Sequence, residues 1–161
     1  MLRNIKRLDQ EIMFNESMFS SLTDNWSTPP DLFKGLNEEF RFTLDACATA
    51  SNATVPNFYD SDSLEKPWTG VVWCNPPYGR GIGKWIRKGR QSALEGAIVV
   101  MLIPSRTDTR WWHEDVMLAS DVRFIKGRLK FGGSKNSAPF PSAIVVFCRK
   151  KEKSGYNYKL F

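Results

Sequence analysis

The tetrapeptide Asn75-Pro76-Pro77-Tyr78 carries more potential chemistry than any other short stretch of this chain. It follows Val71–Cys74, a compact apolar run of the kind that forms a buried parallel strand. Its side chains offer one amide, two prolines without N–H donors and one planar aromatic ring. One interpretation is a proline-rich turn after a strand, because Asn-Pro dipeptides favour turns.

The other interpretation is that the motif activates an amine. The exocyclic amine of adenine is a poor nucleophile, because its lone pair is delocalised into the ring. Two fixed acceptors on its hydrogens would localise that pair, and the side-chain oxygen of Asn75 and the main-chain carbonyl of Pro76 are suited to this. Pro77 keeps the turn rigid, and Tyr78 offers a face on which an extruded base can stack. This pattern predicts methyl transfer to an amine by positioning and electrostatics, without a covalent intermediate.

Strands that alternate with helices must position this motif. Thr28 is expected to be the N-cap of a helix, with Pro29 at its first position and apolar residues following at helical spacing up to Phe40. We expect two more helices, at 82–94 and 109–118, and five strands, at 42–46, 71–74, 97–103, 122–125 and 143–147. The alternation predicts an α/β fold with a mostly parallel sheet, in which ligands bind beyond the carboxyl ends of the strands.

Length and composition exclude several classes of protein. The 161 residues, 42% of them hydrophobic, suit one domain with a sizeable core. The longest apolar run, Ala97–Ile103, is too short to cross a bilayer, which takes about 20 residues. Cys47, Cys74 and Cys148 have no metal-ligand spacing, and an odd, sparse set argues against a disulfide scaffold. We therefore expect a chain without metal or membrane contact, located in a reducing cytoplasm.

The net charge of +6 favours a polyanionic partner. Two basic clusters follow the motif, the first made of Arg80, Lys84, Arg87, Lys88 and Arg90, the second of Arg123, Lys126, Arg128, Lys130 and Lys135. Arg106 follows the strongest predicted strand. Each cluster could be a solvated face, but the position beside a base pocket favours contacts with phosphates.

In order along the chain, a set of motifs resembles the phage-encoded DNA N6-adenine methyltransferases, small Dam-type enzymes that use S-adenosylmethionine. The resemblance covers residues 26–147. Its landmarks are Trp26-Ser27-Thr28-Pro29-Pro30, Leu44-Asp45-Ala46-Cys47-Ala48, Asp62-Ser63-Leu64 with Trp68, Asn75-Pro76-Pro77-Tyr78-Gly79, Arg106-Thr107-Asp108-Thr109 with Trp111-Trp112, Gly127-Arg128-Leu129-Lys130-Phe131 and Ala138-Pro139-Phe140-Pro141-Ser142. Only the Asn-Pro-Pro-Tyr element is specific by itself, and the ordered set is much stronger.

The resemblance implies a shortened Rossmann-like methyltransferase fold, mostly parallel, with helices on both faces of the sheet. The methyltransferase domain would span 26–148, after an N-terminal extension at 1–25 and before a basic tail at 149–161. The implied cofactor is S-adenosylmethionine and the implied partner is DNA, in the host cytoplasm for a phage-encoded chain. The resemblance does not indicate an oligomeric state.

The resemblance also implies roles for residues around the cofactor. Thr28 and Pro29 match the segment that lines the methionine end of the cofactor, and Asp45 the acidic position near its amino group, with Ala46 and Cys47 in the loop that follows. Asp62 matches the position that accepts from the cofactor's adenine amine, and Asn75 is placed beside the cofactor. From the residues alone, Asp45 and Asp62 fit a strand-end turn or a helix cap as well.

Two features depart from the resembled family. The loop after the first strand, at 46–50, is small but contains no glycine, and no carboxylate in 49–60 clearly matches the usual ribose ligand. Phe131 and Phe140 flank the loop that approaches the target base in the resembled enzymes. Either ring is expected to stack on the base or to pack in the core.

Three other functions stay open at this point. One is a methyltransferase acting on RNA or a protein glutamine amide, since Asn-Pro-Pro-Tyr also serves those reactions. The second is an N4-cytosine enzyme, in which the first motif residue is more often Ser. The third is a non-catalytic DNA-binding relative, against which the intact Asn75 and Tyr78 argue.

Overall fold

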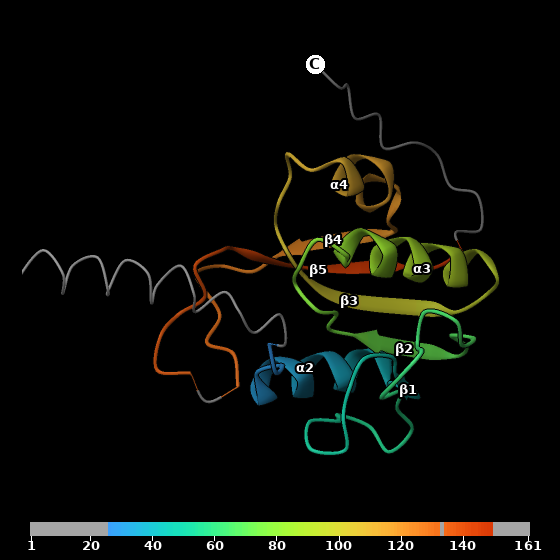
Figure 1. Cartoon of the computed structure of the whole chain (residues 1–161), viewed down its shortest axis with the longest axis horizontal. Helices are drawn as coiled ribbons and strands as arrows, with labels where there is room; N and C mark the ends of the chain where they lie inside the picture. The colour runs from blue at the N-terminus through green and yellow to red at the C-terminus, as the bar shows by residue number, and fades with distance from the viewer. Residues whose placement is uncertain (1–25, 133, 150–161) are drawn as a thin grey trace, which may run out of the picture.

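The computed structural model describes residues 26–132 and 134–149 (Figure 1). The expected extension at 1–25 and tail residues 150–161 lie outside the described residues. The described part is a mixed α/β fold built on a five-stranded sheet with the order β1-β2-β3-β5-β4. The strands are β1 (Leu44–Asp45), β2 (Val71–Cys74), β3 (Ile98–Pro104), β4 (Asp121–Phe124) and β5 (Ser142–Phe147).

The sheet is parallel over its first three strands, as predicted, whereas the other two of its four strand pairings are antiparallel. β1 pairs parallel with β2, and β2 pairs parallel with β3. β5 is antiparallel to both of its neighbours, β3 and β4, so that β4 points in the same direction as the first three strands. The carboxyl ends of β1, β2 and β3 therefore lie at one edge of the sheet.

Helices lie on both faces of the sheet (Figure 1). α2 (Pro30–Phe40) covers one face, and α3 (Ile82–Leu94) and the short α4 (Arg110–Glu114) cover the other. β3 is apolar throughout because both of its faces are buried. Val99 and Met101 pack on the α3 side, whereas Val100 and Leu102 pack on the α2 side, because successive side chains of a strand point to opposite faces.

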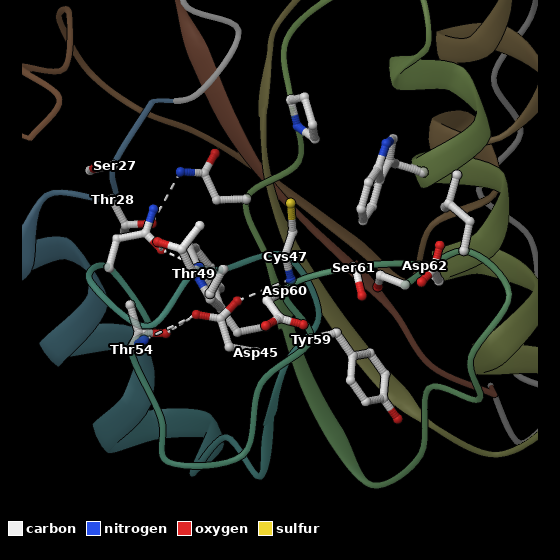
Figure 2. Close-up of a pocket in the computed structure, with 18 of the residues that line it drawn as sticks. Ser27, Thr28, Asp45, Cys47, Thr49, Thr54, Tyr59, Asp60, Ser61 and Asp62 are labelled. Atoms are coloured by element: carbon white, nitrogen blue, oxygen red, sulfur yellow. Dashed lines mark hydrogen bonds between the residues drawn. The ribbon is translucent and has the colours of Figure 1, made fainter.

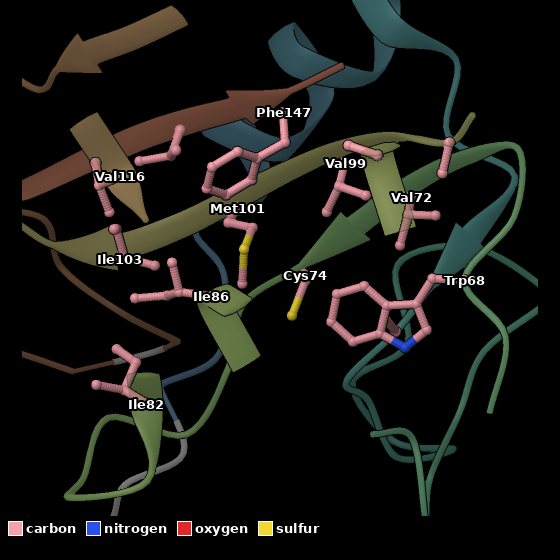
Figure 3. Close-up of a cluster of buried hydrophobic side chains, with 14 of the residues drawn as sticks. Trp68, Val72, Cys74, Ile82, Ile86, Val99, Met101, Ile103, Val116 and Phe147 are labelled. Atoms are coloured by element: carbon pink, nitrogen blue, oxygen red, sulfur yellow. The ribbon is translucent and has the colours of Figure 1, made fainter. Parts of the chain in front are cut away.

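The core on the α3 side is shown in Figure 3. Ile86 of α3 packs among Cys74, Val99 and Met101 of the sheet, and Val116 closes the cluster from the segment after α4. Every one of these five side chains is at most 1% exposed. This packing fixes α3, and with it the turn that contains the Asn-Pro-Pro-Tyr motif.

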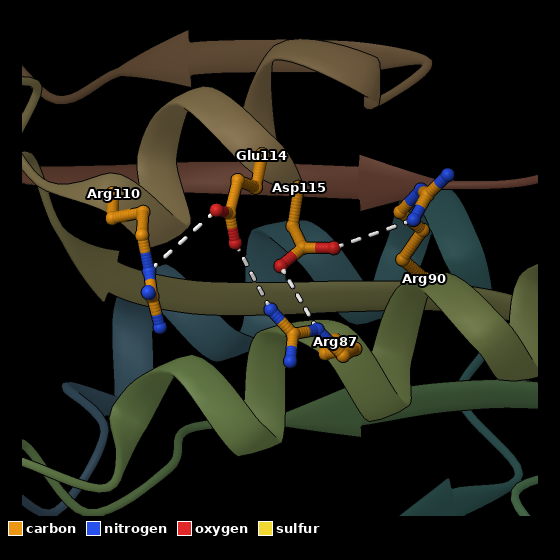
Figure 4. A network of polar contacts seen from close by, with 5 residues as sticks. All are labelled: Arg87, Arg90, Arg110, Glu114 and Asp115. Carbon is orange, nitrogen blue, oxygen red and sulfur yellow. Dashed lines mark hydrogen bonds and ion pairs between the residues drawn. The ribbon is translucent and has the colours of Figure 1, made fainter.

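α4 is held on α3 by a network of charges (Figure 4). The carboxylate of Asp115 is 2% exposed and forms ion pairs with Arg87 at 3.6 Å and Arg90 at 3.4 Å. Arg87 also binds Glu114 at 3.1 Å, and Glu114 in turn meets Arg110 at 3.5 Å. Three of the four ion pairs therefore join α3 to the α4 segment.

Three predicted boundaries are wrong. The strand expected at 42–46 is reduced to β1, and before its first residue the Thr43 hydroxyl, in place of a backbone carbonyl, accepts the N–H of Val71 at 3.0 Å. The helix expected at 109–118 ends at Glu114, and a 3-10 turn (Val116–Leu118) follows the interruption at Asp115. Thr28 is not an N-cap: Pro29 holds that position, without a side-chain hydrogen bond.

Candidate active site

A pocket of about 420 Å³ lies at the carboxyl ends of β1 and β2 (Figure 2). Three parts of the chain line it: the segment 26–28 before α2, the loops between β1 and β2, and the motif with the start of α3. The carboxyl edge is where the predicted parallel sheet would place a ligand. The pocket therefore lies where the sequence predicted a site.

Asn75 lines this pocket, and one polar atom of its side chain has no hydrogen-bond partner among the described residues. Its side-chain Nδ2 donates to the main-chain carbonyl of Trp26 and to the hydroxyl of Thr28, the latter at 3.1 Å. Its Oδ1 is buried and has no hydrogen-bond partner among the described residues. Buried acceptors are nearly always paired in native proteins. The atom that the sequence predicted as the acceptor for an amine is thus the one left unpaired.

The rest of the motif forms a rigid turn beside the pocket. The carbonyl of Pro77 accepts from the N–H of Gly79 at 3.2 Å, whereas within the described part of the chain the carbonyl of Pro76 has no donor. The hydroxyl of Tyr78 donates to the carbonyl of Leu102 at 3.1 Å, and burial raises the pKa of this phenol. Tyr78 therefore stays protonated and anchors the turn to β3.

The side chain of Asp45 accepts hydrogen bonds from the loop that follows β1 and so holds this wall of the pocket. Its Oδ2 accepts from the Thr54 hydroxyl at 2.6 Å and from the Thr54 N–H at 3.1 Å, and its Oδ1 accepts from the N–H of Cys47 at 3.2 Å. The carboxylate is 2% exposed and meets three donors without the help of a ligand. A direct contact with the cofactor's amino group stays a prediction.

The glycine-free loop after β1 is held by side chains instead. The Asn52 side-chain oxygen accepts the N–H of Thr49 at 2.6 Å, and Ser63 donates to the carbonyl of the buried Ala46. Cys47 lines the pocket, and burial together with the charge of Asp45 raises the pKa of its thiol to about 12. A neutral thiol thus faces the pocket at physiological pH. The three cysteines are all free thiols.

Three further carboxylates line the pocket, on Asp60, Asp62 and Glu65, and no Lys, Arg or His is among its lining residues. Asp62, which the sequence singled out, is exposed and has a left-handed backbone, with φ of 53°. The sequence did not single out Asp60, although the polar stretch Asp60-Ser61-Asp62 carried that signal. An acidic lining favours a cationic ligand and disfavours one that carries phosphates.

Aromatic side chains complete the pocket. Trp26, Tyr59, Trp73 and Trp85 line it, and sequence reasoning assigned none of them. Trp85 extends from α3 and packs against Trp68, with their ring centroids 6.1 Å apart. Flat apolar surfaces between polar groups are typical of sites that bind an aromatic ring of a small molecule.

The predicted DNA-contacting cations separate into two groups. Most are exposed or half-exposed, namely Arg80, Lys84, Lys88, Arg106, Arg128 and Lys130. Arg87, by contrast, already forms ion pairs with Glu114 and Asp115, and its contact with phosphates stays a prediction. Arg123 binds Glu39 through two contacts of 2.7 Å, and this hydrogen bonding lowers the pKa of Glu39.

Phe131 and Phe140 differ in exposure. Phe131 is 2% exposed and packs against Trp26, with ring centroids 5.1 Å apart. Of the two alternatives that the sequence left open for Phe131, stacking on a base or packing in the core, the structure shows core packing. Phe140 is half-buried, 5.5 Å from Trp26 and 5.4 Å from Tyr78 between ring centroids.

A five-stranded α/β sheet with a pocket at the carboxyl ends of its parallel strands fits a methyltransferase-like protein. Residues 16–159 match the family model described as DNA N-6-adenine-methyltransferase (Dam). The chain belongs to this family, as the resemblance predicted. It is similar to the DNA N-6-adenine-methyltransferase of Haemophilus phage HP1 (strain HP1c1), with 34% identity over 135 residues that cover 77% of this chain and 78% of the relative.

Residues 26–132 and 134–149 lack two further features. No helix in this part of the chain has the length and apolar character that crossing a membrane requires. The same residues contain no group of three or more His, Cys, Asp or Glu side chains placed to hold a metal ion.

Proposed function

We propose that the protein transfers a methyl group from S-adenosylmethionine to the N6 amine of an adenine that is extruded from DNA. Membership of the DNA N-6-adenine-methyltransferase family supports the reaction. The single observation that carries the proposed mechanism is the buried Oδ1 of the pocket-lining Asn75, which has no hydrogen-bond partner among the described residues. We also propose that residues 26–148 form a shortened Rossmann-like methyltransferase domain, with its ligand at the carboxyl edge of the sheet.

The pocket suits S-adenosylmethionine. Its volume of about 420 Å³ lies in the range of small-molecule sites. The cofactor carries a cationic sulfonium, an ammonium, a ribose and an adenine ring, and the lining offers carboxylates and aromatic faces without a basic side chain. When bound, the cofactor supplies a methyl group on sulfur that transfers directly to the amine nitrogen.

Specific residues would hold each part of this ligand. Asp62 would accept from the adenine amine, and Thr28 and Pro29 would lie along the methionine end. The carboxylate of Asp60 lines the same pocket and is a candidate for the ribose hydroxyls, which the sequence had left without a partner. Asp45 at the end of β1, together with residues 46 and 47 of the loop that follows, would form the wall of the site next to β1.

The motif acts on the amine of the target base. The Oδ1 of Asn75 accepts one amine hydrogen and the carbonyl of Pro76 accepts the other, so that the nitrogen lone pair is localised for attack. Both acceptors are held before the substrate arrives, which avoids reorganisation during the reaction. No strong base is needed, because the nitrogen loses its proton after it has been methylated.

The exposed cations would hold the nucleic acid. Arg80, Lys84 and Lys88 extend from the turn after the motif and from α3, and all are free of ion pairs among the described residues. Contacts with phosphates would offset the few kcal/mol that extruding a base costs. Phe140, half-buried next to Tyr78, is an aromatic candidate beside Tyr78 itself for a contact with the extruded base.

Nucleoside mass spectrometry of unmethylated DNA, incubated with the protein and S-adenosylmethionine, tests the proposal. We expect N6-methyladenine, and a rate that falls about a hundredfold or more in Asn75→Ala, since a preorganised catalytic hydrogen bond is worth that much. The dissociation constant of the cofactor should stay nearly unchanged in this variant. Methylated RNA or glutamine without methylated DNA would replace the proposed substrate, and normal turnover of Asn75→Ala would refute the assigned mechanism.

A further inference from the structure

The side chain of Asn75 is held by a segment almost fifty residues earlier in the chain. Both of its amide hydrogens are used, one by the carbonyl of Trp26 and the other by the hydroxyl of Thr28 at 3.1 Å. We propose that Thr28 is a positioning residue, which orients the Asn75 amide so that its Oδ1 faces the target amine. The proposal rests on the proposed function, because it assigns to Oδ1 the role of acceptor.

The chemistry of the two partners fixes the orientation of the amide. The carbonyl of Trp26 can only accept a hydrogen bond, so it must face the NH2 group of Asn75 rather than the oxygen. The second hydrogen then lies toward Thr28, whose hydroxyl accepts it. With both donors occupied, Oδ1 is the one hydrogen-bonding atom of the side chain that remains for a substrate.

The local structure leaves the Thr28 hydroxyl available for this task. A threonine before a helix ordinarily bonds to a free N–H of the first turn. Here α2 starts at Pro30 with Pro29 as its N-cap, and no side-chain hydrogen bond caps this N-terminus within the described residues. The hydroxyl of Thr28 is directed to Asn75 instead, from a half-buried position on the pocket wall.

The loop between β4 and β5, residues 125–141, supports the segment from the other side. The N–H of Gly132 donates to the carbonyl of Ser27 at 3.0 Å, and a Cβ at Gly132 would lie 2.5 Å from the Cβ of Ser27. Trp26 packs on Phe131 and Phe140 of the same loop. The two residues that precede Thr28 are thus held in place, and the hydroxyl has a defined position from which to orient the amide.

Steady-state kinetics of Thr28→Val and Thr28→Ser test the inference. Valine keeps the shape and removes the hydroxyl, so kcat should fall about five- to tenfold, the effect of one lost hydrogen bond on an acting group. Serine should restore at least half of the original kcat. The KM for S-adenosylmethionine should change less than kcat in both variants. An increase in that KM at unchanged kcat would show that Thr28 only contacts the cofactor, and would overturn the inference.

A double-mutant cycle separates positioning from general damage. If Thr28 acts through Asn75, adding Thr28→Val to Asn75→Ala should lower the residual rate by less than twofold, because there is no amide left to orient. A second five- to tenfold loss in the double variant would overturn the inference.

An NMR measurement tests the contact without relying on activity. The side-chain amide signals of Asn75, assigned by comparison with Asn75→Ala, should show slower hydrogen exchange in the wild type and in Thr28→Ser than in Thr28→Val. Equal exchange in all three proteins would overturn the inference. This result stands even if the wild type fails to methylate adenine, an outcome that would refute the proposed function instead.

Discussion

An amide suits position 75 because it both donates and accepts. A buried polar atom without a partner costs about 1–3 kcal/mol, and a buried charge without a partner costs more. Asn75 leaves a neutral oxygen unpaired, and its two N–H donors meet Trp26 and Thr28. The stability lost at this atom is the reason to expect that a substrate hydrogen occupies it during the reaction.

The carboxylates of the pocket are the second feature at the residue scale. Asp45 is saturated by Thr54 and Cys47, whereas Asp60 and Asp62 are exposed at the pocket. These two carboxylates and that of Glu65, which is also exposed at the pocket, are therefore available to bind a ligand.

Replacing Asp62 by Ala should weaken the binding of S-adenosylmethionine about tenfold or more, because a hydrogen bond to a charged group is worth about 1.5–3 kcal/mol. Isothermal titration calorimetry with the cofactor alone measures this effect. Asp108→Ala is the matched control, since Asp108 is exposed and does not line the pocket. A dissociation constant that stays the same in Asp62→Ala would disprove the role of this carboxylate.

At the scale of elements, the approach of α3 to the sheet positions the motif. Gly89 of α3 lies directly over β3, where an added Cβ would be 2.8 Å from the sulfur of Met101 and 3.2 Å from Val99. The absence of a side chain thus lets the helix pack closely, and the turn at 75–79 is held between β2 and α3.

Gly89→Ala should lower the free energy of unfolding by about 1–3 kcal/mol, the usual cost of overpacking a core. The matched control is Gly35→Ala in α2, where a Cβ would meet nothing within 4 Å. Alanine is the better helix former, so the control should be stabilised by about 0.5–1 kcal/mol. Urea denaturation measures the free energy of unfolding of both variants. Equal changes of this free energy in the same direction would contradict the packing argument.

At the scale of the whole molecule, acidic side chains gather in the pocket and basic side chains lie outside it. The chain has a net charge of +6, yet the pocket is lined by carboxylates without a basic residue. The cations lie outside the pocket, on α3, after β3 and in the β4–β5 loop. Such a distribution suits a cationic cofactor inside and a polyanion outside.

Lys84→Gln should flatten the dependence of DNA affinity on salt, because each lost phosphate contact reduces the slope of log K against log salt by about 0.9. Lys34→Gln removes the same charge from α2, on the other face of the sheet, and should leave the slope nearly unchanged. Fluorescence anisotropy across a salt series measures both slopes. Equal slopes for the two variants would show that only net charge matters.

Local patterns in the sequence were enough to predict the general fold and the position of the site. The apolar run at 71–74 and the alternation of strands and helices predicted a mostly parallel sheet, because burial on both faces requires continuous apolar strands. The Asn-Pro-Pro-Tyr turn at the end of that run predicted the edge of the sheet at which the pocket lies. The ordered motifs predicted the family.

Contacts between distant segments were decided only by the tertiary structure. The residues next to Thr28 in the sequence predict an N-cap, but its hydroxyl accepts a hydrogen bond from Asn75, 47 residues away. The sequence around Arg87 predicts a cation without a partner, but Asp115, at the end of α4, forms an ion pair with it. Asp60 becomes a pocket residue only when the loop folds over β1. Side-chain partners of this kind depend on which elements the fold brings together, and short-range patterns contain no information about that.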